Sequence, residues 1–278
     1  MPSLDLNLQT VSPMFLHGAH NDKDAPPQLR EPAFKALFRY WWRAVTAHQN
    51  PRDQEGELFG QTDSRSPLLI RIVGNRNNLE TLTAYPLPHK RNFSKRAFGT
   101  DQEFRLRLTA NSNLELYQNI ANLSFLLGGV GNRSRRGFGS ICDTSWQFDD
   151  VEAVRKSILN TLNVITEDQY TDNGEAIESR RTTFPDYPTI KKIYWGQLTD
   201  NVDNLLTRIG QATHNHDSDD IGSANPRHSS PIHVRIQKVG RNCLPICSLL
   251  SSASKRNFSL EKQQAFIDSI IGRGGSDD

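Results

Sequence analysis

The residues best suited to chemistry are the arginines and glycines of the segment Gly128–Gly139. Glycines let backbone N–H groups approach a ligand, and guanidinium groups form paired hydrogen bonds with phosphate. The segment lacks the Lys-Ser/Thr pair of a nucleotide-hydrolysing loop, and it follows the end of a helix pattern. A contact to a nucleic-acid backbone is therefore favoured over a flexible turn. Its candidate residues are Gly129, Gly131, Asn132, Arg133, Ser134, Arg135, Arg136 and Gly137.

A second candidate site lies on a predicted helix that begins near Pro32. Lys35, Arg39 and Arg43 are spaced i, i+4 and i+8, so they share one helix face and can follow a phosphodiester backbone. Pairing with acidic neighbours on a solvated face is the alternative. Arg30 precedes the helix. Trp41 falls on the apolar stripe, whereas Trp42 lies off it and is the better candidate for a base or subunit contact.

Further basic residues come in blocks, although the whole chain has a net charge of only +2. Residues 1–147 hold 18 basic and 13 acidic side chains, and residues 148–278 hold 15 and 18. Separate basic blocks on a nearly neutral protein favour a shaped polyanion-binding surface. The additional RNA-binding candidates are Lys90, Arg91, Lys95, Arg96, Arg227 and His228.

Acid–base candidates are few and lie in the polar loop 17–28. His17, His20, Asp22 and Asp24 could cleave RNA, since histidine is the usual acid or base in metal-free cleavage. The flanking sequence offers this loop no rigid support, so we expect a mobile polar loop and no catalytic residue. His214, His216 and Asp217 lack nearby partner ligands at zinc spacing, so no metal site is expected. No cofactor is expected either.

Composition narrows the class of protein. In 278 residues there is no apolar run of the roughly 18–20 residues that a membrane span requires. Met1–Leu8 alternates apolar and polar residues and carries Asp5, unlike a signal peptide. Three cysteines form no disulfide framework, and Cys243 and Cys247 fall in an apolar strand pattern, where buried thiols are expected. We therefore expect a cytoplasmic protein.

The first half contains the elements that must position these candidates. Alternation predicts strands over 4–11, 68–73, 103–109 and 138–144. Helical spacing predicts one helix from Pro32 and another that starts with a Ser112–Glu115 capping box and ends at Gly128. The order strand, helix, strand pair, helix, strand is that of a ferredoxin-like α+β unit.

The second half is less regular. A helix over 151–165 is capped by Asp149 or Asp150, and another begins at Ser259 and stops at Gly272. Strands are predicted over 232–239 and 244–250, joined by a turn at Arg241-Asn242. Residues 167–188 and 211–230 are predicted as surface loops. We interpret this half as a second, degenerate α+β unit.

Several of these segments together resemble one protein family. They are Pro13–Ala19, the run from Leu29 through Trp41-Trp42-Arg43, Gly128–Gly139 and, more weakly, Pro226–Ile232. In these segments the chain is similar to the RAMP superfamily of CRISPR-associated proteins, most closely to the first RAMP subunit of the type III-B effector complex. Ala33 and Ala36 stand where the family pattern usually has Ser and Gly. The second half is also short for the family.

The resemblance implies two ferredoxin-like (RRM-like) RAMP units, at residues 1–147 and 148–278, the second degenerate. It implies a non-catalytic RNA-binding subunit that holds guide RNA near its 3′ end and helps to capture target RNA, with other RAMP subunits as partners. Base pairing would then select sequence, so the protein need hold only backbone and shape. Two alternatives are a RAMP ribonuclease using the loop after the first strand, and an RNA-binding protein that acts alone.

Overall fold

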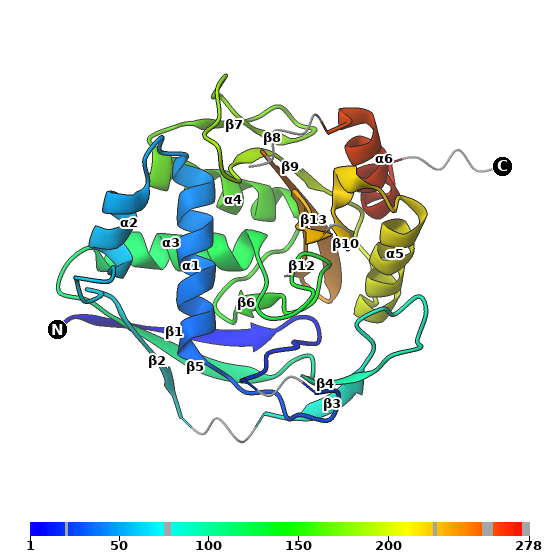
Figure 1. Ribbon diagram of the computed structural model, residues 1–278, viewed down its shortest axis with the longest axis horizontal. Helices are drawn as coiled ribbons and strands as arrows, with labels where there is room; N and C mark the ends of the chain where they lie inside the picture. Colours follow the sequence, from blue (N-terminus) through cyan, green and yellow to red (C-terminus); the bar gives the residue numbers. More distant parts are fainter. Residues whose placement is uncertain (20–21, 75–78, 225–226, 252–257, 274–278) are drawn as a thin grey trace.

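The computed structural model describes residues 1–19, 22–74, 79–224, 227–251 and 258–273 (Figure 1). Its first sheet has the strand order β2-β5-β1-β6 and is antiparallel. Leu6 faces Leu106 and Leu4 faces Leu108 across β1 and β5, so alternation places the leucines on one face. All four predicted strands are present, the last one shorter than expected: β1 (Ser3–Thr10), β2 (Leu69–Val73), β5 (Glu103–Thr109) and β6 (Ile141–Asp143).

Two helices cover the leucine face of this sheet, α1 (Glu31–Thr46) and α3 (Leu114–Leu127). Pro32 stands in the first turn of α1, where its missing N–H leaves no bond unmade. The Ser112–Glu115 capping box is wrong. Asn113, with φ 60°, precedes the first helical residue of α3 and makes no side-chain cap hydrogen bond.

The second sheet has the order β12-β13-β9-β8-β7. The predicted hairpin of β12 (Ile232–Val239) and β13 (Asn242–Leu250) is present. The expectation of loops over 167–188 is wrong in part, because β7 (Tyr170–Asp172) and β8 (Ile177–Ser179) lie there. The strand β9 (Ile190–Trp195), which joins the hairpin to them, was not predicted.

Helices cover both faces of the second sheet. One face packs against α5 (Val202–Asn215) and α6 (Leu260–Ile271), and the other against α4 (Val151–Thr166), α1 and α3. Asp150 caps α4 by accepting from the Ala153 N–H at 2.7 Å, and Ser259 caps α6, both as predicted. The last turn of α5 occupies part of the predicted loop 211–230.

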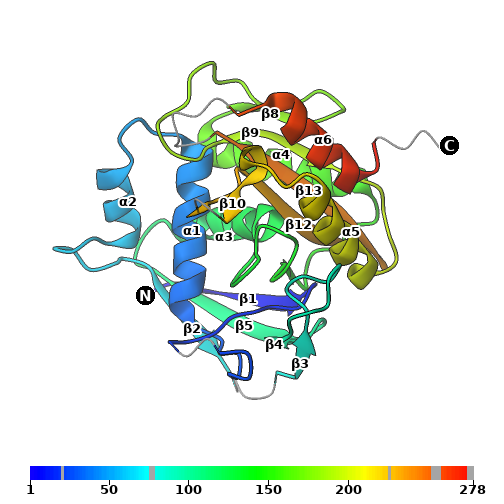
Figure 2. The same ribbon diagram turned by 45° about the vertical axis from the view of Figure 1, so that its right-hand side comes forward.

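The layers therefore alternate, with α1, α3 and α4 between the two sheets and α5 and α6 outside the second (Figure 2). A hydrophobic cluster in the middle joins Trp41 and Val45 of α1 to Leu162 of α4 and Ile246 of β13. The proposed boundary between residues 147 and 148 thus separates segments that share a core, and it stays a prediction.

The remaining elements extend from this layered body. A hairpin of β3 (Thr81–Ala84) and β4 (Lys95–Phe98) forms its own small sheet near α5, and so do β10 (Ser223–Ala224) and β11 (Arg227–His228). A short helix, α2 (Arg52–Phe59), follows α1. This helix was not predicted, although Pro51 and the acidic first turn of α2 suit a helix start.

Candidate nucleic-acid interface

The basic face predicted for α1 exists. Lys35, Arg39 and Arg43 lie along one side of the helix, and the buried carboxylate of Glu55 in α2 binds two of them. Arg39 Nε lies 2.5 Å from Glu55 Oε1, and Arg43 Nη1 lies 3.3 Å from Oε2. Burial, followed by the charge of Arg39, lowers the pKa of Lys35. The acidic pairing considered as an alternative therefore engages two of the three cations through one carboxylate.

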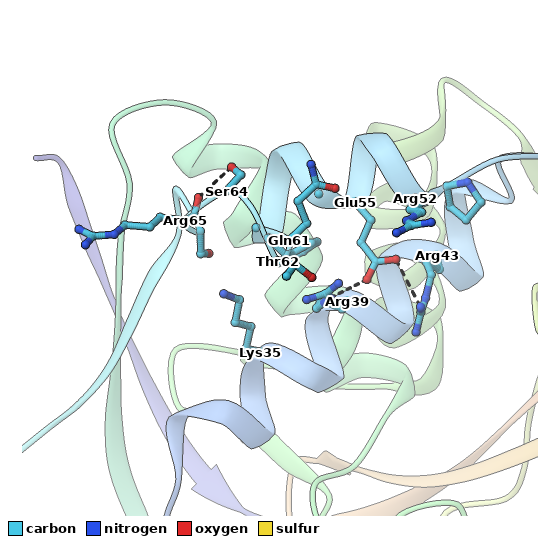
Figure 3. A pocket seen from close by; sticks show the side chains of 14 residues that line it. Lys35, Arg39, Arg43, Arg52, Glu55, Gln61, Thr62, Ser64 and Arg65 are labelled. Carbon is cyan, nitrogen blue, oxygen red and sulfur yellow. Dashed lines mark hydrogen bonds and ion pairs between the residues drawn. The ribbon is translucent and has the colours of Figure 1, made fainter.

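A pocket of about 720 Å³ opens between α1, α2 and the loop 60–66 (Figure 3). Its cationic lining is Lys35, Arg39, Arg43, Arg52 and Arg65, with Glu55 as the one acidic lining residue described. In Figure 3 Lys35 and Arg39 point towards the loop, whereas Arg65 extends outward from the rim. Arg52 and Arg65 were not among the predicted RNA-binding residues, and α2, the helix that places Arg52, was not predicted.

The glycines of the segment Gly128–Gly139 serve close packing of the chain against itself. A side chain on Gly131 (φ 91°) would clash with the carbonyl of Phe15, and one on Gly139 (φ 64°) with the carbonyl of Val130. The Asn132 N–H also bonds the Phe15 carbonyl at 2.9 Å. The expected opening of this backbone towards a ligand is therefore wrong at the buried Gly139, whereas Gly131 is exposed and its role stays a prediction. Gly137 is also buried, against side chains of α5 and β12, which corrects its expected place at the surface. The roles of Gly129, Asn132, Arg133, Ser134 and Arg135 stay predictions.

Arg136 belongs to the protein interior, which corrects its assignment as a surface phosphate contact. Its guanidinium donates to the carbonyls of Ile221, Ile232 and Arg135, each at 3.0 Å, and lies over the Phe266 ring. Burial lowers the pKa of this group. Because these bonds and the ring already hold the buried side chain, Arg136 fastens the glycine-rich segment to the second sheet.

Arg135 and Arg133 remain at the surface side of this segment, partly exposed. The Arg135 guanidinium lies 5.9 Å from the centre of the Tyr40 ring in α1. Burial raises the pKa of Tyr40 to about 12, and the charges of Arg135 and Arg43 oppose this increase. The glycine-rich segment and the basic face of α1 therefore meet at Tyr40.

Two other predicted patches adjoin this meeting point. Arg135 Nη1 donates to the Ser230 carbonyl at 3.0 Å, next to the Arg227-His228 strand. On the other side, the loop of the β3–β4 hairpin places His89 near Arg133. Burial lowers the pKa of His89, and the charges of Lys90, His214 and Arg133 lower it further. The basic face of α1 (Lys35, Arg39 and Arg43), Arg133 and Arg135 of the glycine-rich segment, and Lys90 of the β3–β4 loop thus form one surface, the basic band.

Individual members of these patches differ in exposure. Lys90 and Arg91 are exposed and Arg96 is partly exposed, whereas Lys95 is buried, which corrects its expected place on the surface. His228 Nε2 lies 2.8 Å from the Asp219 carbonyl oxygen. Arg30, exposed at the start of α1, donates to the His17 carbonyl at 3.2 Å.

Trp42 is buried, so its expected contact with a base or subunit is wrong. Its ring packs against His48 and Phe59, with centroid distances of 5.7 and 6.3 Å. Trp41 is buried as predicted. Both indoles are buried because the helix packs between two layers. Sequence periodicity, which assumes a single apolar stripe, does not detect this arrangement.

The candidate acid–base groups differ in exposure. His17 is buried, and its pKa is lowered by burial and then by the charge of Lys95. Asp22 and Asp24 are exposed, and Asp24 lies 4.0 Å from Lys23. His20 lies outside the described residues.

The remaining features are possible metal ligands, the three cysteines and possible membrane-spanning helices. Across the described ranges, no group of three or more His, Cys, Asp or Glu side chains could hold a metal ion. Cys142, Cys243 and Cys247 are free and buried, and burial raises the pKa of each thiol. Among the helices described, none is long and apolar enough to cross a membrane.

Comparison with known proteins identifies related sequences and folds. Residues 7–142 match the family model of the RAMP superfamily. The chain is 26% identical over 200 residues to the CRISPR system Cmr subunit Cmr1-1 of Pyrococcus furiosus, a match that covers 59% of this chain and 57% of that relative. The matched region thus spans little more than half of the relative's length.

Solved structures extend the likeness to nearly the whole fold. The crystal structure of Cmr1 from Pyrococcus furiosus in its apo form matches with a TM-score of 0.66 at 16% identity, covering 98% of this chain and 97% of that one. A chain of the Type III-B Cmr-beta structure bound to cognate target RNA matches with a TM-score of 0.65 at 11% identity, covering 97% and 98%. The resemblance inferred from the sequence is confirmed: residues 7–142 match the RAMP superfamily model, and the chain as a whole has a fold similar to that of Cmr1.

Proposed function

We propose that this protein is a non-catalytic RNA-binding subunit of a type III-B CRISPR ribonucleoprotein. It holds the guide RNA near its 3′ end and helps to capture complementary target RNA in antiviral defence, in the cytoplasm, alongside other RAMP subunits. The observation that carries this proposal is the meeting of Arg135 and Arg43 at Tyr40, which joins two basic segments about ninety residues apart into one band. The similarity to a chain of a complex that contains target RNA supports it.

The fold also fits this proposal. We infer that residues 1–147 form a ferredoxin-like unit, because β2-β5-β1-β6 is the strand order of a βαββαβ arrangement. In the second half, β9, α5, β12, β13 and α6 follow in the same sequence, with β13 between β9 and β12. β8 lies beside β9 where a fourth strand would pair. This substitution makes the second unit degenerate.

Fluorescence anisotropy with single-stranded RNA tests the binding surface. A Lys35→Gln, Arg133→Gln, Arg135→Gln variant of the full chain should bind more weakly and to a similar degree for every RNA sequence. Its log–log salt slope should fall by about 0.7 for each phosphate that the variant no longer neutralises. Arg136 is left intact because it is buried.

The matched control is Arg105→Gln. Arg105 lies on the outer face of the first sheet, away from α1, where it bonds Asn7 and pairs with Asp5. Wild-type affinity is expected for this variant. An equal loss of affinity in Arg105→Gln, or an unchanged salt slope in the triple variant, would refute the assignment. Affinity purification from the native host should recover guide RNA and other RAMP subunits, whereas recovery of the chain alone with RNA would favour the stand-alone protein.

The ribonuclease alternative has its own test. RNA cleavage requires a base near the 2′-hydroxyl and an acid near the leaving oxygen, or a metal held by carboxylates. We expect the purified chain to bind RNA without cutting it, with or without Mg²⁺ or Mn²⁺. Replacing His17, His20, Asp22 and Asp24 by alanine should leave target cleavage by the assembled complex close to normal. Loss of cleavage with intact assembly would establish the ribonuclease instead.

A further inference from the structure

We infer that the pocket between α1 and α2 binds a phosphate monoester at an RNA end in preference to the phosphodiesters of the strand. This inference rests on the proposed RNA-binding function and assigns one ligand group to one part of the basic band. It begins with charge. In the described part of the chain, five cationic side chains line the pocket against one carboxylate, that of Glu55, so this lining has a formal charge of +4.

The way Glu55 is bound determines which donors remain for a ligand. It engages Arg39 through Nε and Arg43 through Nη1, and its own carboxylate is buried. A guanidinium has five N–H donors, so each arginine keeps further donors while Glu55 fixes its position. Two positioned guanidinium groups beside Lys35 form a site that is organised before the ligand arrives (Figure 3).

The opposite wall adds polar groups. The loop 60–66 contributes Gln61, Thr62 and Ser64, and its shape is held by reciprocal backbone bonds between Gln61 and Ser64. Gly60, with φ 80°, closes this turn so tightly that a side chain there would lie 2.6 Å from the Ser66 nitrogen. Hydroxyl and amide groups opposite cations are suitable partners for phosphate oxygens.

The lining also indicates which part of a nucleotide enters. Among the lining residues that the structure describes, the one aromatic residue is Phe59, which is 1% exposed and so offers no stacking surface to a base. The pocket therefore recognises phosphate and not the identity of the base. A monoester carries a charge of about −1.5 to −2 at pH 7 against −1 for a diester, so a lining of +4 favours the monoester.

The test measures binding of the full chain to a labelled RNA of one sequence that carries a 5′-phosphate, a 3′-phosphate or neither. One phosphorylated RNA should bind roughly tenfold more tightly than the unphosphorylated RNA at low salt. If the 5′-phosphorylated RNA binds more tightly, the pocket holds the 5′ end; if the 3′-phosphorylated RNA does, it holds the 3′ end. The preference should shrink from pH 7 to pH 5, because the second ionisation of a monoester has a pKa of about 6 and no histidine is among the lining residues described.

Variants on the two helices that line the pocket test whether the preference for phosphorylated RNA arises there. Lys35→Gln on α1 and Arg52→Gln on α2 should each abolish the preference, whereas Arg241→Gln, an exposed arginine at the β12–β13 turn, should keep it. Equal binding of all three RNAs, or a preference that survives in both pocket variants, would overturn the inference while RNA binding itself stands. Absence of binding to any RNA would instead refute the proposed function.

Discussion

At the scale of single residues, burial separates the basic side chains that hold the fold from those available to a ligand. Arg136 and Arg235 are both buried and both donate to backbone carbonyls, as Arg235 does to those of Ile141 and Ile236. Lys35 and Arg135 are partly exposed. Sequence could not make this distinction, because an arginine that satisfies buried carbonyls and one that awaits a phosphate have the same local pattern.

Because Arg136 is buried and Arg135 is not, replacing these neighbours should lower the free energy of unfolding by different amounts. Arg136→Leu should lower the free energy of unfolding by about 2–4 kcal/mol, because the carbonyls of Ile221 and Ile232 lose their donor. Arg135→Gln should change it by at most about 1 kcal/mol, since its bond to Ser230 is only partly buried. Urea denaturation measures both. Similar stabilities for the two variants would contradict the assignment of Arg136 to the interior.

The burial of His233 predicts that the stability of the fold depends on pH. It is buried against Tyr40, whose hydroxyl lies 2.9 Å from Nε2, and its pKa is lowered well below 6.5 by burial and then by Arg135 and Arg136. Below pH 6.5 the unfolded chain therefore binds a proton that the folded chain does not. Stability due to His233 falls as pH decreases towards its folded pKa, by up to about 1.4 kcal/mol per pH unit.

Unfolding free energies at pH 7 and pH 5 provide the measurement. His233→Gln, which keeps a partner for Tyr40, should lose less stability over this interval than the wild type. Because other buried histidines contribute to both chains, only the difference between variants tests the assignment. The same loss in wild type and His233→Gln would exclude a role for His233.

At the scale of elements, the glycine-rich segment predicts a comparison between two glycines of positive φ. Gly139 (φ 64°) packs against the backbone of Val130, whereas Gly174 (φ 90°) has no atom within 4 Å of an added Cβ. Gly174→Ala should cost about 1–2 kcal/mol for its backbone conformation alone. Gly139→Ala should cost clearly more, because backbone atoms must move. Thermal and urea unfolding measure the difference, and equal costs would contradict close packing of the segment.

Elements with a regular apolar spacing were predicted, whereas the burial of the polar side chains between their apolar residues was not. The strand 103–109 was predicted at its observed bounds because its leucines alternate with exposed residues. β12 shows the same alternation, yet His233, Arg235 and Gln237 are also buried. Their polar groups bond inside the protein, so polarity did not indicate exposure. The pocket was missed for a related reason: Arg52 acquires its place only when α2 packs beside α1.

At the scale of the whole molecule, the packing of the layers conflicts with two independent units. One cluster contains Trp41 of α1, Leu127 of α3, Leu162 of α4 and Ile246 of β13. α1 and α3 thus contribute to the cores on both of their sides. A fragment that ends at residue 147 would expose the apolar surface that α4 and the second sheet cover, and burial of such surface is the main stabilising contribution in a fold of this size.

We therefore predict a single cooperative unfolding transition for the full chain. Circular dichroism and tryptophan fluorescence should report the same urea midpoint, since a two-state transition is seen alike by every probe. Fragments 1–147 and 148–278, expressed separately, should show broad, non-cooperative melting, and mixing them should restore part of the native signal. Trp195 offers a local probe in the second sheet, where the Arg155 guanidinium lies 4.2 Å from its ring centre. Two separate midpoints, or a fragment that unfolds cooperatively alone, would establish the boundary at residue 147 as a division between independently stable domains.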